Sequence, residues 1–226
     1  MKSFSFSFPP PQIQIMAASK PLYVFSDIET ESFKAHRILQ IAAISTKGDQ
    51  FSIYINPKGP LPGNCLEITG LYYHKDQLYR KGHVLPSVSI TQALRSFAKW
   101  LESLDQSVHL VFHNAFSFDI VVLLRHFNNQ KVPFPSCVLN VHDSLPAFRK
   151  HIKVTEISGF KLGLLAEHFK VPLTDAHNAI DDANCLREVC EVFVKSKGIE
   201  LEIFLNSYMK PISYFQNKIK DSKVRA

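Results

Sequence analysis

The sequence lacks any run of about 20 consecutive apolar residues, the length that a helix needs to cross a bilayer. Serine, proline and glutamine interrupt every apolar stretch near the N-terminus, so the apolar core of a secretory signal peptide is missing as well. We therefore expect no membrane partner and an intracellular protein, in the nucleus or the cytoplasm.

Cysteine is also scarce, with four residues in 226. None of them forms a C-x-x-C pair, and no Cys/His cluster has the spacing of a zinc site. Cys185 and Cys190 lie five positions apart in a predicted helix, which places them on different faces. This pattern is typical of reduced, buried thiols and argues against a disulfide-stabilised scaffold.

The chain does have enough apolar residues for one large core, together with an excess of positive charge. Hydrophobic residues make up 46% of the sequence, and the formal net charge is +6. We predict a single domain at residues 20–205, preceded by a flexible tail at 1–19 and followed by a basic, partly mobile tail at 206–226. The positive charge favours an anionic partner, of which nucleic acid is the usual one.

The order of the predicted elements indicates an α/β fold. Three strands come first, and the short links between them are typical of an antiparallel meander. Strands and helices then alternate, so we predict a mixed sheet with helices on its faces. The basic run His74–His83 is interpreted as a loop that either grips a phosphate backbone or is simply solvated. Predicted strands cover 21–27, 38–45, 51–55, 108–112 and 137–141, and predicted helices cover 90–104, 118–127, 162–169 and 179–195.

Two carboxylates end the first predicted strand. Asp27 and Glu29 follow the apolar run Tyr23–Phe25, and they point to the same face because side chains alternate along a strand. Two like charges at the end of a buried strand repel each other, and a divalent cation would remove that cost. The pair therefore predicts a metal site to which other parts of the chain should contribute.

Two later segments have groups that could join this pair. Asp119 lies at the entry of an apolar helix, where it is either a residue that the helix dipole favours or a ligand. His177 and Asp182 lie near the start of the last long helix, and five positions correspond to about 140° around a regular helix. Both can face one point only if His177 precedes the helix and Asp182 lies in its first turns. Spacing alone does not choose between Asp181 and Asp182.

In this order the three segments resemble the motifs of the DEDDh branch of the DnaQ-like 3′→5′ exonucleases, a branch that includes the TREX enzymes. The motifs here read Phe-x-Asp-x-Glu-Thr, His-Asn-Ala-x-x-Phe-Asp and His-x-Ala-x-x-Asp. The resemblance covers about residues 21–195. The stretches Asp143-Ser-Leu-Pro and Gly159-Phe-Lys-Leu-Gly-Leu-Leu narrow it to the PML-exon-nine-like exonuclease proteins.

The resemblance implies an RNase H-like mixed sheet and a specific set of site residues. The family's four metal-binding acids match Asp27, Glu29, Asp119 and Asp182, and the spacing of its last motif selects Asp182 over Asp181. The general base of the family matches His177, and Glu29 would also act in catalysis, nearest the terminal 3′-hydroxyl. Positions near the substrate match Ile28, Thr30, Leu71, His113 and Asn114.

The implied reaction is hydrolysis of nucleic acid from a free 3′ end, which releases nucleoside 5′-monophosphates. Two Mg²⁺ ions, with Mn²⁺ as a substitute, would clamp the attacking and leaving oxygens. His177 would accept a proton from the attacking water, a role that the ordinary pKa of imidazole near 6.5 suits at neutral pH.

Two rival interpretations stay open. A catalytically silent module, like the PML domain that is thought to have lost its catalytic residues, would bind nucleic acid or protein without metal-dependent hydrolysis. A different RNase H-like enzyme, such as an endonuclease, would share the acids but would not need His177 at this spacing. We favour DNA over RNA as the substrate, and a homodimer of the TREX type is compatible with the sequence but not demanded by it.

Overall fold

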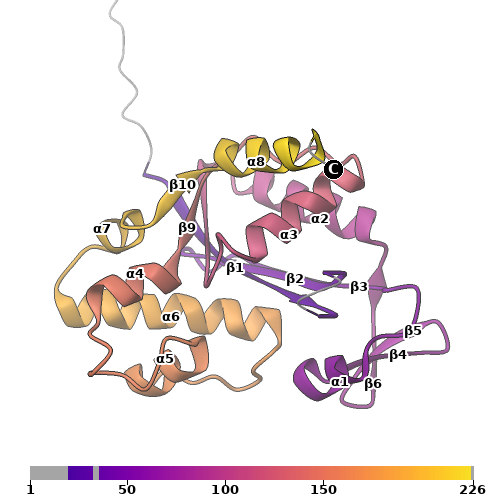
Figure 1. The fold of residues 1–226 in the computed structure, drawn as a ribbon, viewed down its shortest axis with the longest axis horizontal. Helices are drawn as coiled ribbons and strands as arrows, with labels where there is room; N and C mark the ends of the chain where they lie inside the picture. The colour runs from indigo at the N-terminus through magenta and orange to yellow at the C-terminus, as the bar shows by residue number, and fades with distance from the viewer. Residues whose placement is uncertain (1–19, 33–35, 225–226) are drawn as a thin grey trace, which may run out of the picture.

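A computed structural model of the chain describes residues 20–32 and 36–224. The predicted flexible tail at 1–19 lies outside these residues. The described residues form a main sheet of seven strands in the order β10-β9-β8-β1-β2-β3-β7, with helices on both faces (Figure 1). Its strands are β1 (Leu22–Thr30), β2 (Ile38–Ser45), β3 (Gln50–Ile55), β7 (Ser87–Val88), β8 (Val108–Phe112), β9 (Val138–Asp143) and β10 (Met209–Pro211).

The pairing confirms the predicted mixed sheet. β1, β2 and β3 form the antiparallel meander, whereas β8 runs parallel to both β1 and β9. The parallel ladder between β1 and β8 ends where Phe25 lies opposite Val111. β1 continues to Thr30 and pairs over that length with β2. The end of β1 therefore projects past the carboxyl end of β8, which leaves space for groups from later segments.

Alternation along β1 divides the interior into two cores. Leu22, Val24 and Ile28 pack with the helices on one face, and Tyr23 and Phe25 pack with those on the other. Figure 1 shows the helices in these two layers. The first layer contains α2 (Ile90–Ser103), α3 (Asp119–Asn129) and α8 (Ile212–Val224), and the second contains α4 (Ser144–His151), α5 (Leu162–Phe169), α6 (Ala179–Lys197) and α7 (Leu201–Asn206).

The basic run His74–His83, predicted as a loop, is instead part of a small three-stranded antiparallel sheet. Leu71 and Leu78 point inward on this sheet and pack in one cluster with residues of β2 and α1. Lys75 and Asp76 form the first turn with φ angles of 45° and 59°. A two-residue hairpin turn of this kind needs positive φ at both positions, which Asn-Gly usually supplies. The elements are α1 (Gly63–Thr69), β4 (Leu71–His74), β5 (Gln77–Arg80) and β6 (His83–Leu85).

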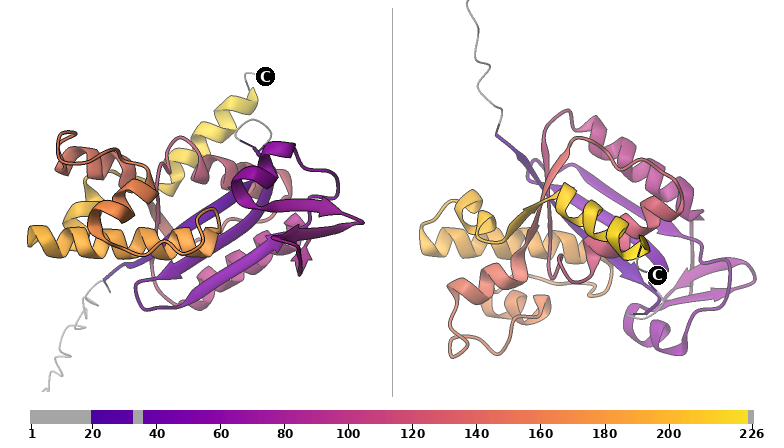
Figure 2. Two further views of the ribbon diagram at one scale, coloured as in Figure 1. Left: turned by 90° about the horizontal axis from the view of Figure 1, so that it is seen from below. Right: turned by 45° about the horizontal axis from the view of Figure 1, so that its top comes forward.

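The basic segment after residue 206, predicted to be a partly mobile tail, contains a strand and a helix. β10 pairs antiparallel with β9, and α8 packs against α3. Figure 2 shows α8, in yellow, on the face of the main sheet that also carries α2 and α3. Phe215 is 1% exposed and Ile219 is 6% exposed. The two apolar side chains lie four positions apart on one face of α8, and the polar residues between them, Gln216, Asn217 and Lys218, conceal this pattern in the sequence. None of the helices in the described part of the chain is long and apolar enough to cross a membrane.

Candidate active site

Three distant segments meet at the projecting end of β1. This strand carries Glu29, the first turn of α6 carries Asp182, and His177 lies on the loop just before that helix. One ligand atom of each of these three side chains lies within 4.8 Å of the other two. The spacing of His177 and Asp182 required His177 to precede the helix and Asp182 to lie in its first turns. The structure has this arrangement, because α6 begins at Ala179, between the two residues.

The four acids share one electrostatic environment. Burial raises the pKa of Asp27 well above its ordinary value, and the charges of Glu29, Asp119 and Asp182 raise it further. The pKa of Glu29 rises to about 8, mainly because this side chain is buried and secondarily because Asp182 is close, while Arg80 acts in the opposite direction. The carboxylates of β1, α3 and α6 therefore repel one another.

Asp119 and Asp182 show the same effect. Burial raises the pKa of Asp119, the first residue of α3, to about 7, and the charge of Asp143 adds to this. The pKa of Asp182 rises to about 6 through burial, against the hydrogen bond that its carboxylate accepts from the backbone N–H of His177. Buried carboxylates that repel one another form a donor set that suits hard divalent cations such as Mg²⁺ or Mn²⁺.

The main chain around His177 is held firmly, although the side chain is exposed. Its φ angle is 62°, an uncommon value for a residue other than glycine. The N–H of His177 donates to Asp182 Oδ2 at 3.0 Å. Next to it, Asn178 Oδ1 accepts a hydrogen bond from Gln40 Nε2 at 2.8 Å. The loop is therefore fixed to both α6 and β2, and the imidazole faces solvent.

Asp143 arranges the loop that leads to Asp119. Its Oδ1 accepts from the N–H groups of Asn114 at 2.9 Å and Leu145 at 3.1 Å, and its Oδ2 accepts from Phe116 N–H at 3.0 Å. Asp143 was not among the predicted site residues. The available signal was its place at the polar end of a strand, where loops of a parallel sheet carry functional groups.

Two residues predicted to lie near the substrate, His113 and Leu71, have most of their contacts within the fold. His113 is held between Ser144 Oγ at 2.8 Å and the carbonyl oxygen of Phe160, to which its Nε2 donates at 2.7 Å. Burial lowers the pKa of His113 to about 4. Leu71 is 0% exposed within the cluster under the small sheet. Both ring nitrogens of His113 have partners within the fold and Leu71 is buried, so contacts of either side chain with substrate stay predictions.

The other three predicted substrate positions differ in exposure. Ile28 packs in the core on the face opposite to the carboxylates. Thr30 is half-buried at the end of β1, and Asn114 is exposed with a φ angle of 76°. Asn114 is the most exposed of the five, and the contacts of Thr30 and Asn114 with substrate stay predictions.

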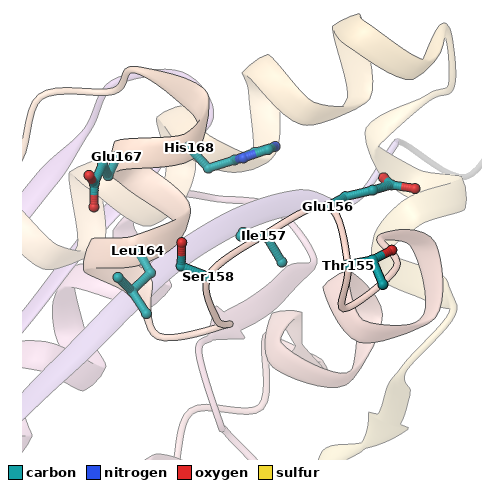
Figure 3. A pocket seen from close by; sticks show the side chains of 7 residues that line it. All are labelled: Thr155, Glu156, Ile157, Ser158, Leu164, Glu167 and His168. Carbon is teal, nitrogen blue, oxygen red and sulfur yellow. The ribbon is translucent and has the colours of Figure 1, made fainter.

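A hollow elsewhere on the surface is separate from this site. It lies between α5 and the loop that precedes it, and Figure 3 shows its seven lining side chains. None of the predicted site residues lines it. These lining residues are Thr155, Glu156, Ile157, Ser158, Leu164, Glu167 and His168.

A mixed sheet that gathers four acids and a loop histidine at the end of its central strand defines a hydrolase of the nuclease class. The family model described as Exonuclease (RNase T) matches residues 24–190, which include all five of these side chains. The chain belongs to this exonuclease family.

Individual relatives agree with this assignment. A PolC-type DNA polymerase III of Clostridium perfringens is 28% identical over 187 residues, which cover 80% of this chain and 12% of the polymerase. The chloroplastic/mitochondrial exonuclease DPD1 of Arabidopsis thaliana is 31% identical over 179 residues, which cover 74% of this chain and 54% of that protein. The structure of E. coli exonuclease I in complex with a dT13 oligonucleotide superposes with a TM-score of 0.62 at 16% identity, covering 78% of this chain and 41% of that one.

These comparisons confirm part of the sequence-based prediction. They support the α/β fold and the exonuclease family, whereas the narrower TREX-like and PML-like resemblance has no counterpart among these relatives. The chain spans only 12% of the polymerase, 54% of DPD1 and 41% of exonuclease I.

Proposed function

We propose that this protein is a divalent-cation-dependent 3′→5′ exonuclease that acts on DNA and releases nucleoside 5′-monophosphates. The observation that carries the proposal is the convergence of Glu29, His177 and Asp182 within 4.8 Å. We assign Asp27 and Asp119 to the same site, because the charges of Glu29, Asp119 and Asp182 raise the pKa of Asp27 and the charge of Asp119 raises that of Glu29.

Asp27, Glu29, Asp119 and Asp182 would hold two cations, with Mg²⁺ as the natural ion and Mn²⁺ as a substitute. When bound, such ions supply Lewis-acid stabilisation of the charge that develops on the phosphate and its leaving oxygen. The acids themselves provide the fixed geometry, since they lie on β1 and at the starts of α3 and α6. Bound cations would also offset the repulsion that raises the pKa of Glu29 to about 8.

His177 would act as the general base. Its imidazole is exposed beside Glu29 and Asp182, where it can accept a proton from the water that attacks the phosphate. The hydrogen bond from its own N–H to Asp182 fixes the backbone beneath the ring. The direction of digestion and the assignment to the DEDDh branch rest on the resemblance of the three motifs.

DNA is the proposed substrate for two reasons. One relative is a DNA polymerase, and the superposed exonuclease I was solved with a DNA oligonucleotide. The formal net charge of +6 suits a polyanion.

The TREX-like and PML-like assignment stays a proposal, carried by the stretches that begin at Asp143 and Gly159. In the structure Asp143 and the carbonyl of Phe160 both hold the loop that precedes Asp119.

End-labelled oligonucleotides test this proposal. A 5′-labelled single strand should give a ladder of shortened products with Mg²⁺ or Mn²⁺ and no products with EDTA, whereas a 3′-labelled strand should release labelled mononucleotide at once. The same sequence as duplex DNA and as RNA defines the substrate preference. Cutting of a closed circle would identify an endonuclease, and binding without any hydrolysis would identify a silent module.

Variants tie the activity to the site. His177→Ala and Asp119→Asn should each lower the rate by about 10²–10⁴-fold without unfolding the protein. Asp181→Asn and His168→Ala are matched controls, because Asp181 is bound to Thr174 and His168 is exposed on α5. Wild-type rates in the first two variants would overturn the assignment of the site.

A further inference from the structure

One arginine connects the small sheet to the loop of the general base. Arg80 comes from β5, and its side chain is 8% exposed. The small sheet and α1 lie beside the loop that leads into α6 (Figure 1). A guanidinium buried at this depth needs several acceptors to offset the loss of water.

The acceptors of Arg80 fix its direction. Nε donates to the carbonyl oxygen of Thr69 at 2.9 Å, which anchors the guanidinium to the end of α1. The two terminal nitrogens form a bidentate ion pair with the carboxylate of Asp175, with Nη2–Oδ1 at 3.0 Å. Nη2 also lies 3.3 Å from the carbonyl oxygen of His177. A planar fork with acceptors on three backbone or side-chain groups has very little freedom to rotate.

Asp175 and His177 begin and end the short segment that this fork holds. Arg80 keeps the pKa of Asp175 well below its usual range through the hydrogen bonds between them, so the carboxylate stays ionised. The other side of the segment is bound by Gln40, which lies opposite Glu29 on β2. Gln40 Nε2 donates to Asn178 Oδ1 at 2.8 Å, and Gln40 Oε1 accepts from Ala179 N–H at 3.1 Å.

The two anchors differ in what they hold. Gln40 fixes the residues after His177 to the sheet, whereas Arg80 is the side chain that contacts the carbonyl of His177 itself. We propose that Arg80, paired with Asp175, is a positioning residue that places the loop of His177 for proton abstraction, so that the small sheet is a structural part of the active site. This inference rests on the proposed nuclease function and on His177 as its base.

The positioning role predicts a loss in rate rather than in substrate binding. In Arg80→Ala the loop should move, and kcat should fall by about 10–100-fold, because a displacement of about 1 Å of a catalytic group can cost about 10²-fold. KM should change less than about threefold, since Arg80 is buried and does not face solvent. Arg80→Lys should recover only part of the rate, because lysine cannot form the bidentate pair.

A charge-neutral variant separates positioning from a loss of folding. Arg80→Ala/Asp175→Ala removes both charges, so neither is left buried without its partner. Its kcat should lie within about threefold of that of Arg80→Ala alone, because both substitutions break the Arg80–Asp175 pair and the other partner of Asp175, Lys81 at 2.6 Å, is exposed. Arg187→Ala is the matched control: Arg187 pairs with Glu191 on α6 at 3.1 Å, outside the loop, and this variant should keep the wild-type rate.

Hydrogen exchange gives a readout that is independent of activity. Backbone amides of residues 174–178 should exchange faster in Arg80→Ala than in the wild type, while those of β1 and β2 stay protected. Unchanged kcat, or unchanged exchange in this loop, would overturn the proposal. A large rise in KM at constant kcat would also overturn it, because Arg80 would then be a substrate contact. If the wild type shows no metal-dependent hydrolysis, the proposed function fails, and the exchange experiment still decides whether Arg80 holds the loop.

Discussion

Removing one charge from the acid cluster should stabilise the metal-free protein while it abolishes activity. Glu29 is 8% exposed, and burial together with Asp182 and Asp119 raises its pKa to about 8. The substitution Glu29→Gln retains the size of the side chain and a hydrogen-bonding group, and it removes the charge. Since the side chain lies among other carboxylates, the variant relieves repulsion that the folded protein otherwise carries.

The direction of the pH dependence follows from the raised pKa. Glu29 binds its proton more tightly in the folded than in the unfolded chain, so the folded state loses stability as pH rises from about 4.5 through about 8. At about 1.4 kcal/mol per pKa unit, the difference between 4.5 and about 8 corresponds to roughly 5 kcal/mol at pH 9. Glutamine loses the favourable interaction with Arg80, which reduces the gain. We expect Glu29→Gln to be more stable than the wild type by about 2–4 kcal/mol at pH 9, or about 5–15 °C in Tm.

Urea and thermal unfolding in EDTA at pH 4.5 and pH 9 measure this difference, which should vanish at the lower pH. Glu31→Gln is a matched control two residues along the chain. Glu31 is equally buried but accepts a hydrogen bond from Arg37 Nε at 2.7 Å, so its neutralisation should lower stability. Mg²⁺ or Mn²⁺ at 100 times Kd should stabilise the wild type by about 2.7 kcal/mol and Glu29→Gln by much less. A Glu29→Gln variant that is less stable than the wild type at pH 9 in EDTA would refute the reasoning.

Three further predictions concern regions that support the site. Burial lowers the pKa of His142 to about 4, so this side chain stays neutral in the folded protein, whereas it takes up a proton below about pH 6.5 in the unfolded chain. The wild type should therefore lose about 2 kcal/mol of unfolding free energy relative to His142→Gln between pH 7 and pH 5. Asp143→Ala should lower stability by about 2–4 kcal/mol in urea unfolding and should also reduce nuclease activity, because three backbone N–H groups lose their acceptor, whereas Asp143→Asn should retain part of both. Deletion of residues 209–226 should lower the free energy of unfolding, measured in urea, by more than about 3 kcal/mol, because Phe215 and Ile219 leave the core. An unchanged urea midpoint would show that α8 is dispensable.

The residues of the proposed site could be predicted because their segments have local signals, and the resemblance of the last motif selected Asp182 over Asp181. Asp27 and Glu29 follow an apolar strand with the alternation that puts them on one face. The spacing of His177 and Asp182 required a loop residue followed by a helical one, and the structure has that arrangement. Each of these two signals extends over seven residues or fewer, so no knowledge of the fold was needed to read it.

The residues that position this chemistry could not be found in the same way. Arg80 is defined by Asp175, which lies 95 residues further along the chain, and Asp143 is defined by backbone groups 27 and 29 residues before it. The small sheet was missed for a related reason. Its first turn uses Lys75 and Asp76 at positive φ, and contacts with other segments stabilise that conformation, among them the hydrogen bond from Asn56 Nδ2 to the carbonyl oxygen of Asp76 at 3.1 Å.

Exposure within the site differs between the four acids and His177 in a way that suits the roles proposed for them. Metal ligands must keep a fixed geometry, and Glu29 and Asp119 are buried on rigid elements at a cost in electrostatic repulsion. A general base must pass its proton to solvent after each turnover, and His177 is exposed. An exposed ring on a loop is normally mobile, so the backbone beneath it needs restraint from elsewhere. Arg80 binds the carbonyl oxygen of His177, and Gln40 binds the N–H of Ala179. Both contacts hold the main chain and leave the imidazole of His177 exposed to solvent.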